Sequence, residues 1–392
     1  MDKRLVYLDN SATTRICEAA LKKYNDVSLG NFGNPSSLHS LGFDAEREIS
    51  AARAAITASL SAKECEVVFT ASGSEANNLA IIGRAYAKER YKRGAKIITT
   101  EGEHASVNEP FKKLCAEGFK VAYIPTKDGK VDLEVLKKEL TLDVILVSIM
   151  MVNNETGALY DTRAVAELTR QRCPEAIVHI DATQSYMKIP FTKASVGADM
   201  ITVSSHKIEG PKGVGALVID PKIIKSRGLA PVIYGGGQGA GLRSGTENVP
   251  GIAAFGAAVT EGQKNIRANY QKLNDLREYL IAKIEKTPAL SEISPTLPEN
   301  HAPHILNLTL PAIKSETMLH YLSSEGIFVS SGSACSSNSA HKVSALIAYG
   351  RSEAEADTSI RISFSHRNEK EDVDMLCKRL EDGLMRLARI KR

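Results

Sequence analysis

The feature that most constrains the fold is an alternation of short apolar segments with segments of helical periodicity, from about residue 66 to residue 219. Apolar runs without polar alternation, such as VILVSIM at 144–150, are typical of strands covered on both faces. Their alternation with helices predicts a mostly parallel sheet between two layers of helices. The predicted strands are Glu66–Thr70, Lys96–Thr100, Lys120–Pro125, Val144–Met150, Ile177–Ile180, Met200–Ser204 and Ala216–Ile219; the predicted helices are Ser74–Arg90, His104–Glu117, Leu133–Leu140 and Thr162–Arg172.

The pattern changes after about residue 250. One long helix is predicted from about Ala253 to Lys286, followed by a polar, proline-containing stretch. A smaller α/β set comes next, predicted as strand His304–Leu310, helix Ser315–Glu325, strands Ile327–Ser330 and Ser359–Ser363, and helix Glu369–Arg389. We therefore expect a large domain at 15–252 and a small domain formed by 1–14 and 253–392, which includes a long linking helix and a mobile Ser/Gly-rich loop at 330–340.

Composition excludes several classes of protein. The chain has 392 residues, and its net charge of +4 is too small to indicate nucleic-acid binding. The longest apolar run, Val144–Val152, is far short of the ~20 residues of a membrane span, and we expect neither a span nor a secretory leader. The six cysteines have no metal-ligand spacing, so we expect no metal site and a reducing cytoplasm. They are Cys17, Cys65, Cys115, Cys173, Cys335 and Cys377.

Polar clusters directly follow five of the predicted strands, at 71–75, 101–104, 153–157, 181–184 and 204–207. Open α/β sheets bind ligands at the carboxyl ends of their strands. One such cluster would mean little, but five that converge on one edge predict a binding crevice.

The first cluster, ASGSE, opens a predicted helix. Gly73 permits close approach of a ligand, Ser74 offers a hydroxyl, and the helix start offers free N–H groups, which together suit a phosphate or another anion. The alternative is an ordinary helix N-cap made by Ser74.

Three ionisable residues stand at the other strand ends. Asp181 needs a donor or cation if it is buried, and either a protonated ring nitrogen or a structural partner would serve. Lys207 could form a Schiff base if its pKa were lowered, although a lone loop lysine is usually solvated. His104 stands alone on its loop and could be structural.

Two residues in the second half of the chain also suit chemistry. Cys335 lies in SSGSACSSNS at 330–339, where a thiol on a flexible tether could act as a nucleophile, or could be a passive thiol in a linker. Arg361 interrupts the strand-like segment SIRIS, where it could bind a carboxylate through two parallel hydrogen bonds or occupy an exposed strand position.

Taken together, these motifs resemble those of cysteine desulfurases of the NifS/IscS type, in the class V aminotransferase family of fold-type I pyridoxal-phosphate enzymes. The resemblance covers nearly the whole chain. It is carried by YLDNSATT, NFGNPSSLH, FTASGSEANNLA, VNNETG, HIDATQS, SSHKIEGPKG, LRSGTEN, SSGSACSS and SIR. The fold it implies is a large domain with a mostly parallel sheet between helices and a smaller α/β domain.

The resemblance implies a role for each matched residue. Lys207 would bind pyridoxal 5'-phosphate covalently, Asp181 would pair with its ring nitrogen, and His104 would stack on the ring and assist proton transfer. Other residues would contact the ring or the substrate (Asn154), the ring hydroxyl (Gln184), the phosphate (Gly73, Ser74, Ser204, His206), the phosphate of a neighbouring subunit (Thr246) and the substrate carboxylate (Arg361).

The implied reaction removes sulfur from L-cysteine, giving L-alanine and a persulfide on Cys335. A homodimer and sulfur acceptors, such as an iron–sulfur scaffold or a tRNA thiolation enzyme, are the implied partners, with no direct contact to nucleic acid or membrane. The alternatives are a selenocysteine lyase, another class V aminotransferase, or a non-catalytic sulfur-transfer scaffold; Cys335 argues against the second, and the intact set of site residues argues against the third.

The sequence departs from the family pattern at three places. The family usually has a glutamate at the position of Gly239, an aromatic residue or histidine at that of Glu209, and a proline after Cys335. None of the three changes removes a residue to which the resemblance gives a catalytic role.

Overall fold

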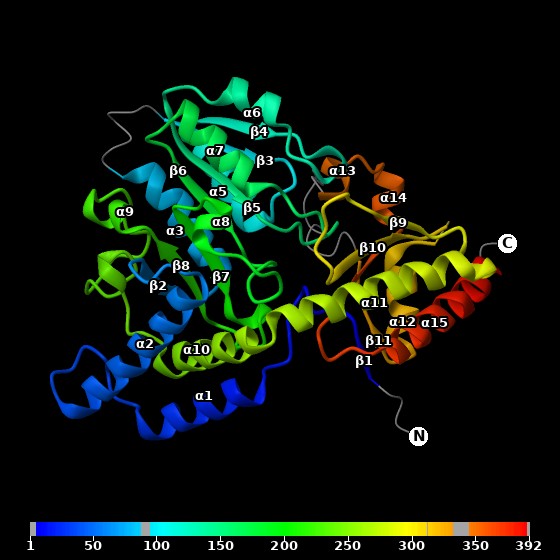
Figure 1. The fold of residues 1–392 in the computed structure, drawn as a ribbon, viewed down its shortest axis with the longest axis horizontal. Helices are drawn as coiled ribbons and strands as arrows, with labels where there is room; N and C mark the ends of the chain where they lie inside the picture. Colours follow the sequence, from blue (N-terminus) through cyan, green and yellow to red (C-terminus); the bar gives the residue numbers. More distant parts are fainter. Residues whose placement is uncertain (1–4, 88–94, 312, 332–344, 390–392) are drawn as a thin grey trace.

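The computed structural model describes residues 5–87, 95–311, 313–331 and 345–389 (Figure 1). The described residues form one sheet of seven strands, one of four and one of two, and helices pack around the two larger sheets. Within the described ranges, none of the helices has the length and apolar character that crossing a bilayer requires.

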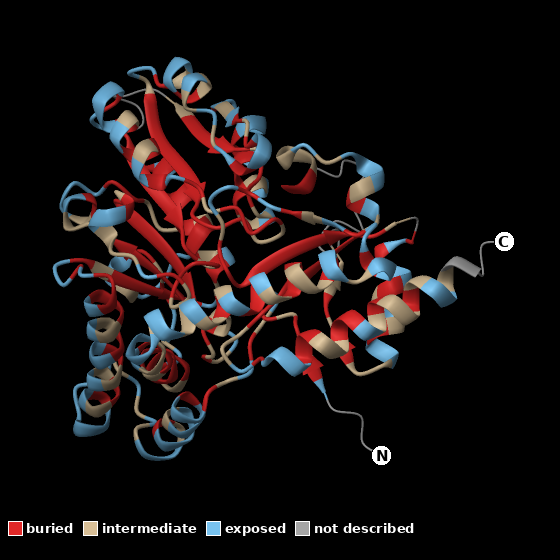
Figure 2. Ribbon diagram, turned by 45° about the vertical axis from the view of Figure 1, so that its right-hand side comes forward, coloured by how far each residue is buried: buried red, intermediate tan, exposed pale blue. Residues whose placement is uncertain are grey.

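The larger sheet has seven strands and is mostly parallel, as predicted. β8 is antiparallel to both of its neighbours, β2 and β7, and the remaining pairs are parallel. In spatial order the strands are β2 (Glu66–Thr70), β8 (Gly215–Ile219), β7 (Met200–Ser204), β6 (Ile177–Asp181), β5 (Val144–Met150), β3 (Lys96–Thr100) and β4 (Lys120–Ile124). Every residue of β5 to β8 is buried, which explains the apolar runs in the sequence (Figure 2).

Helices cover both faces of this sheet. One face packs against α3 (Gly73–Tyr86) and α5 (Ala105–Ala116). The other packs against α2 (Ser40–Ser59), α6 (Leu133–Glu139), α7 (Thr162–Arg172) and α10 (Val249–Lys264), and α1 (Glu18–Gly30) packs on α10. The short helices α8 (Lys193–Val196) and α9 (Pro221–Lys225) lie in connections. The helices α1 and α2 are not among the elements predicted from the sequence.

The smaller sheet is antiparallel, with the order β12 (Ser330–Ser331), β13 (Ser359–Ser363), β10 (Ile305–Thr309) and β9 (Ser294–Thr296). Beside it β1 (Val6–Tyr7) pairs in parallel with β11 (Ile327–Phe328). A second apolar cluster joins Val6 and Leu8 to α11 (Ile266–Lys286), α12 (Ser315–Ser324) and α15 (Lys370–Arg389). The short helices α13 (Ala345–Tyr349) and α14 (Glu353–Asp357) complete this region. The domain boundaries given above stay a prediction.

The prediction of one helix over 253–286 is wrong. Two helices, α10 and α11, meet at Asn265, whose backbone (φ −126°, ψ 18°) is not helical. Helical periodicity continues across this position, and asparagine is a weak helix former that tolerates the break. Consequently α10 packs with the large sheet while α11 extends over the small one (Figure 1).

Candidate active site

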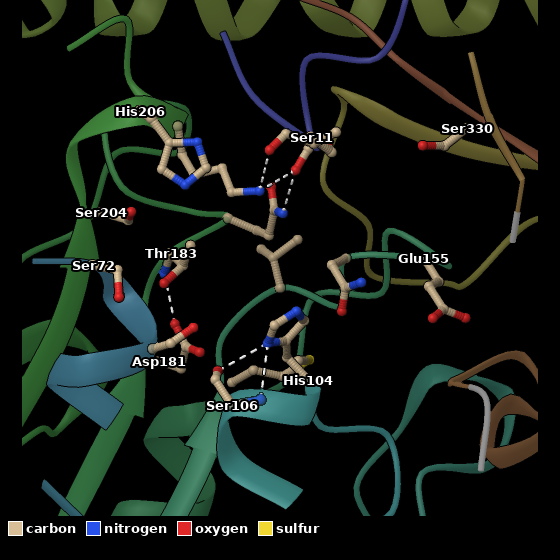
Figure 3. A pocket seen from close by; sticks show the side chains of 18 of the residues that line it. Ser11, Ser72, His104, Ser106, Glu155, Asp181, Thr183, Ser204, His206 and Ser330 are labelled. Carbon is tan, nitrogen blue, oxygen red and sulfur yellow. Dashed lines mark hydrogen bonds between the residues drawn. The ribbon is translucent and has the colours of Figure 1, made fainter. Parts of the chain in front are cut away.

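A cavity of about 380 Å³ lies at the carboxyl ends of the large sheet's parallel strands, against the small sheet (Figure 3). This is the edge at which the polar clusters of the sequence predict a crevice. Ten of the predicted site residues line it: Gly73, Ser74, His104, Asn154, Asp181, Gln184, Ser204, His206, Lys207 and Arg361.

The anion-binding part of the cavity is built at the start of α3. The hydroxyl of Ser72 accepts from the backbone N–H of Glu75 and so makes the N-cap. The alternative in which Ser74 makes the cap is therefore wrong, because the helix begins at Gly73. Ser74 is exposed at the cavity instead, and a Cβ on Gly73 would come within 3.3 Å of the Cβ of Ser204, so a larger residue would crowd this approach.

Asp181 is the last residue of β6 and only 5% exposed. Its Oδ1 accepts from the backbone N–H of Thr183 at 2.9 Å, and its Oδ2 accepts from Asn77 Nδ2 at 2.8 Å. Burial is thus compensated by two neutral donors, and no hydrogen-bonded cation is recorded beside the carboxylate in the described part of the chain. It therefore remains available to a cationic ligand group.

His104 serves as the N-cap of α5 and also lines the cavity. Its Nδ1 accepts from the backbone N–H of Ser106 at 3.1 Å. Burial lowers the pKa of His104, and the positive charge of Lys207 adds to this, whereas Asp181 opposes it. The structural and functional interpretations of His104 are therefore compatible, because one ring edge caps the helix while the ring faces the cavity.

Lys207 ends a short 3₁₀ turn directly after β7. Its Nζ donates to the backbone oxygens of Ser11 and Ala12, the latter at 2.8 Å, and all three residues line the cavity. His206, beside it, faces Thr13, and burial lowers its pKa to about 4. His206 is therefore neutral at physiological pH.

Arg361 reaches the cavity from β13 of the small sheet. Its Nη1 donates to the backbone oxygen of Asn154 at 2.9 Å. Its Nη2 donates to Asp9 Oδ1 at 3.0 Å and to Ser330 Oγ at 3.1 Å. Arg361 is 8% exposed, so the interpretation as an exposed strand position is wrong.

Of the two remaining predicted site residues, Thr246 is described by the structure and Cys335 is not. Thr246 is exposed and is not part of the lining of its own chain's cavity. Cys335 and most of the predicted 330–340 loop lie outside the described residues. Ser330 and Ser331, which precede Cys335 in the chain, do line the cavity.

Several residues of the site were not predicted from the sequence. Ser11 and Ala12 belong to a motif that was noticed without a role, and Thr183 lies inside the 181–184 cluster. Glu103 belongs to the 101–104 cluster but has no predicted role. It is buried, and both of its carboxyl oxygens accept from the backbone N–H of Met150, a residue that lines the cavity. Burial raises the pKa of Glu103 to about 8.

The fold and this cavity define a class of protein, the fold-type I transferases. A family model described as aminotransferase class-V matches residues 6–376, and the chain belongs to this family.

Relatives narrow the resemblance. The chain is 39% identical over 378 residues to a "NifS/IcsS protein homolog" of Lactobacillus delbrueckii, with 94% of each chain covered. It is 37% identical over 385 residues to "Cysteine desulfurase IscS 1" of Archaeoglobus fulgidus, with 97% of each covered. The resemblance to NifS/IscS proteins is thereby confirmed over the full length.

Solved structures of similar proteins have the same fold. A "NIFS-LIKE PROTEIN" superimposes with a TM-score of 0.89 at 34% identity, covering 97% of this chain and 100% of its own. A structure described as "SspA in complex with cysteine" superimposes with a TM-score of 0.76 at 29% identity, covering 93% and 100%. The predicted fold class is confirmed.

Proposed function

We propose that this chain is a pyridoxal-phosphate-dependent cysteine desulfurase, which converts L-cysteine into L-alanine and leaves the sulfur as a persulfide on Cys335. The observation that carries the proposal is the convergence of Lys207, Asp181 and His104 on one cavity with Arg361. The first three suit a pyridine aldehyde, and the fourth suits an amino-acid carboxylate.

The residues around the cavity fit pyridoxal 5'-phosphate. The hydroxyl of Ser204 is buried and has no hydrogen-bond partner among the described residues, and the opening above Gly73 would admit a phosphate oxygen. Gly73, Ser74, Ser204 and His206 would hold the phosphate, Asp181 the ring nitrogen, Gln184 the ring hydroxyl, and Lys207 the aldehyde carbon. When bound, the cofactor supplies an electron sink that weakens bonds at the substrate carbons.

The substrate side has its own anchors. Arg361 would bind the carboxylate and Asn154 would position the substrate beside the ring. The thiolate of Cys335 would form the new S–S bond as the Cβ–S bond of cysteine breaks, and the carbon fragment would take up a proton and leave as alanine. His104 is placed to assist the proton transfers.

A homodimer is part of the proposal. Leu29, Phe32, Leu38 and Phe43 are between 56% and 90% exposed along α1, α2 and their connection, an unusual density of bare apolar side chains. A second copy that covers them would allow Thr246 to reach the neighbouring cofactor phosphate. Acceptors in iron–sulfur cluster assembly or tRNA thiolation, and a cytoplasmic location, complete the proposal.

The test is to incubate the purified protein, loaded with pyridoxal 5'-phosphate, with L-cysteine while alanine and sulfide are measured and persulfide is mapped on all six thiols. We expect alanine and persulfide on Cys335. Cys335→Ala should keep the yellow colour and release no sulfide, whereas Cys115→Ala, at an exposed thiol, serves as the matched control.

Undiminished turnover in Cys335→Ala would reject the nucleophile. A colourless wild type after loading would reject the cofactor, and turnover of L-selenocysteine alone would favour a lyase.

A further inference from the structure

A chain of hydrogen bonds joins His104 to Asp181 through Asn77 and Ser106, two side chains without a role in the proposed reaction. Ser106 Oγ lies 2.9 Å from His104 Nδ1 and 2.8 Å from Asn77 Nδ2. Asn77 Nδ2 lies 2.8 Å from Asp181 Oδ2. Asn77 is 1% exposed, so water does not compete for these bonds.

The direction of each bond follows from donor chemistry. A carboxylate only accepts, so the group of Asn77 that faces Asp181 must be its NH₂; the flipped amide would place an oxygen 2.8 Å from a carboxylate oxygen. The same NH₂ has a second hydrogen and donates it to Ser106 Oγ. The hydroxyl hydrogen of Ser106 then remains for His104 Nδ1.

The backbone sets the protonation of the histidine ring independently. The N–H of Ser106 donates to His104 Nδ1 at 3.1 Å, and a backbone N–H cannot accept. Nδ1 is therefore unprotonated, and the neutral ring carries its proton on Nε2. In Figure 3, Ser106 and His104 face one another at the start of α5, so the ring edge opposite Ser106 is the one left for the cavity.

We propose that Asn77 and Ser106 are positioning residues that transmit the charge of Asp181 to His104 and hold its ring as the tautomer protonated at Nε2. The inference rests on the proposed function, in which Asp181 and His104 contact the same cofactor ring. Its consequence is that neutral His104 presents an N–H to the cavity and enters the reaction as a hydrogen-bond donor. If Asp181 took up a proton, the amide of Asn77 would be able to flip. Ser106 Oγ would then lose the hydrogen bond from Asn77 that orients its hydroxyl toward His104.

The test is ¹⁵N NMR of full-length protein labelled at histidine, at pH 8, where the ring of His104 is neutral. The His104 signals are assigned by their loss in His104→Gln, and their chemical shifts report the two tautomers directly. Wild type should show a protonated Nε2 and an unprotonated Nδ1. Ser106→Ala should raise the ratio of Nδ1–H to Nε2–H about five-fold, the effect of losing one of two donors.

Three further variants sharpen the test. Asn77→Ala should move the ratio in the same direction, and Ser106→Thr, which keeps the hydroxyl, should restore the wild-type signals. The matched control is Asn108→Ala on the same helix: it removes an amide that donates to the backbone oxygen of Glu103, without touching the bridge. This control should leave the His104 shifts unchanged.

Three results would overturn the proposal: Nδ1 protonated in wild type, unchanged His104 shifts in Ser106→Ala, or an equal change in Asn108→Ala. If Asn77→Ala does not fold, the comparison of Ser106→Ala with Ser106→Thr still tests the proposal. The spectra are recorded before and after addition of pyridoxal 5'-phosphate. Failure to bind it would remove the proposed function, whereas the tautomer result stands by itself.

Discussion

The two sheets contribute to the cavity in different ways. The large sheet supplies its polar groups from separate strand ends, and each is held by bonds of its own, as for Asp181 by Thr183 and His104 by Ser106. The small sheet supplies one guanidinium, Arg361, held from three directions. Affinity for the cofactor should therefore be distributed over many contacts, whereas recognition of the substrate carboxylate should be concentrated in one residue.

The largest expected effect on activity is at Lys207, the one cofactor contact that the others cannot replace. Lys207→Ala removes the amine that would bind the aldehyde covalently, so turnover should fall by at least about 10⁴-fold and the yellow colour should be lost. Absorbance after dialysis measures the attachment, with the exposed Lys212→Ala as control. Lys188 is a second half-buried amine, and the burial lowers its pKa to about 7. Covalent cofactor mapped to Lys188 in wild type would contradict the assignment.

Arg361→Gln tests whether recognition of the substrate carboxylate depends on this one residue. Removing the cation that would pair with the substrate carboxylate should lower kcat/KM for L-cysteine by about 10³-fold. Affinity for pyridoxal 5'-phosphate should stay within about two-fold, because the large sheet supplies those contacts. Arg351→Gln, which removes a guanidinium bonded to Pro295 and Glu355 away from the cavity, is the control. Equal losses of substrate and cofactor affinity would contradict the idea that the large sheet binds the cofactor and the small sheet binds the substrate carboxylate.

Glu103 allows a test by pH of how the large sheet holds its site. The native pKa is about 8 and the ordinary value is 4.5, so between these values the unfolded chain loses a proton that the native protein keeps. Wild-type stability therefore falls as pH rises through this window. Glu103→Gln does not titrate, and its advantage in unfolding free energy over wild type should grow by roughly 4 kcal/mol from pH 4.5 to 8. Denaturant unfolding at the two pH values measures it; an advantage independent of pH would mean that Glu103 is ionised in the native state.

Ser204→Ala tests whether affinity for the cofactor is shared among many contacts. The buried hydroxyl would contribute one hydrogen bond among several to the phosphate, so affinity for pyridoxal 5'-phosphate should fall only about ten-fold. KM for L-cysteine should not change once the cofactor saturates the protein. Ser59→Ala, which removes another buried hydroxyl far from the cavity, controls for general loosening. A loss as large as that of Lys207→Ala would show that the phosphate contacts are not shared.

The strands and the site residues that follow them were predictable because both signals are local. An apolar run followed by Asp181 or Lys207 can be read without knowledge of the fold, and β2, β3, β5, β7 and β13 begin and end as predicted. The predicted N-cap of α3, Ser74, is two residues away from the observed cap, Ser72. The segment ASGSE contains both serines, and only the position of the first helical residue decides which of them is the cap.

What the sequence could not predict depends on contacts between distant residues. The partner of Arg361 is Asp9, 352 positions away, and nothing near either residue indicates the other. The antiparallel insertion of β8 beside β2 depends on packing across the whole sheet, as does the break at Asn265, where the periodicity is uninterrupted. Asn77 and Ser106 come together only because α3 and α5 pack side by side.

The smallest expected effect is at the joint between the two halves. Glu209 follows Lys207 on the large-sheet side and accepts two hydrogen bonds from Arg367, which follows β13, at 3.1 and 2.7 Å. The side chain of Arg367 is 45% exposed, so solvent screens the pair and its coupling energy should be only about 0.5–1 kcal/mol. A double-mutant cycle of Glu209→Gln and Arg367→Gln, measured by denaturant unfolding at low and high salt, gives this value.

The outcome bears directly on the division between the sheets. A small coupling means that the halves are joined by packing and by Arg361, and that the position of Lys207 does not depend on the Glu209 pair. Glu209 also has a left-handed backbone (φ 63°), so the single variant Glu209→Gly, which relieves that conformation while removing the charge, should lose less stability than Glu209→Gln. A coupling above about 2 kcal/mol would instead make the pair a main link between the halves. In that case substitutions on the small-sheet side should also disturb cofactor binding, and the distributed and concentrated parts of the site could no longer be treated as independent.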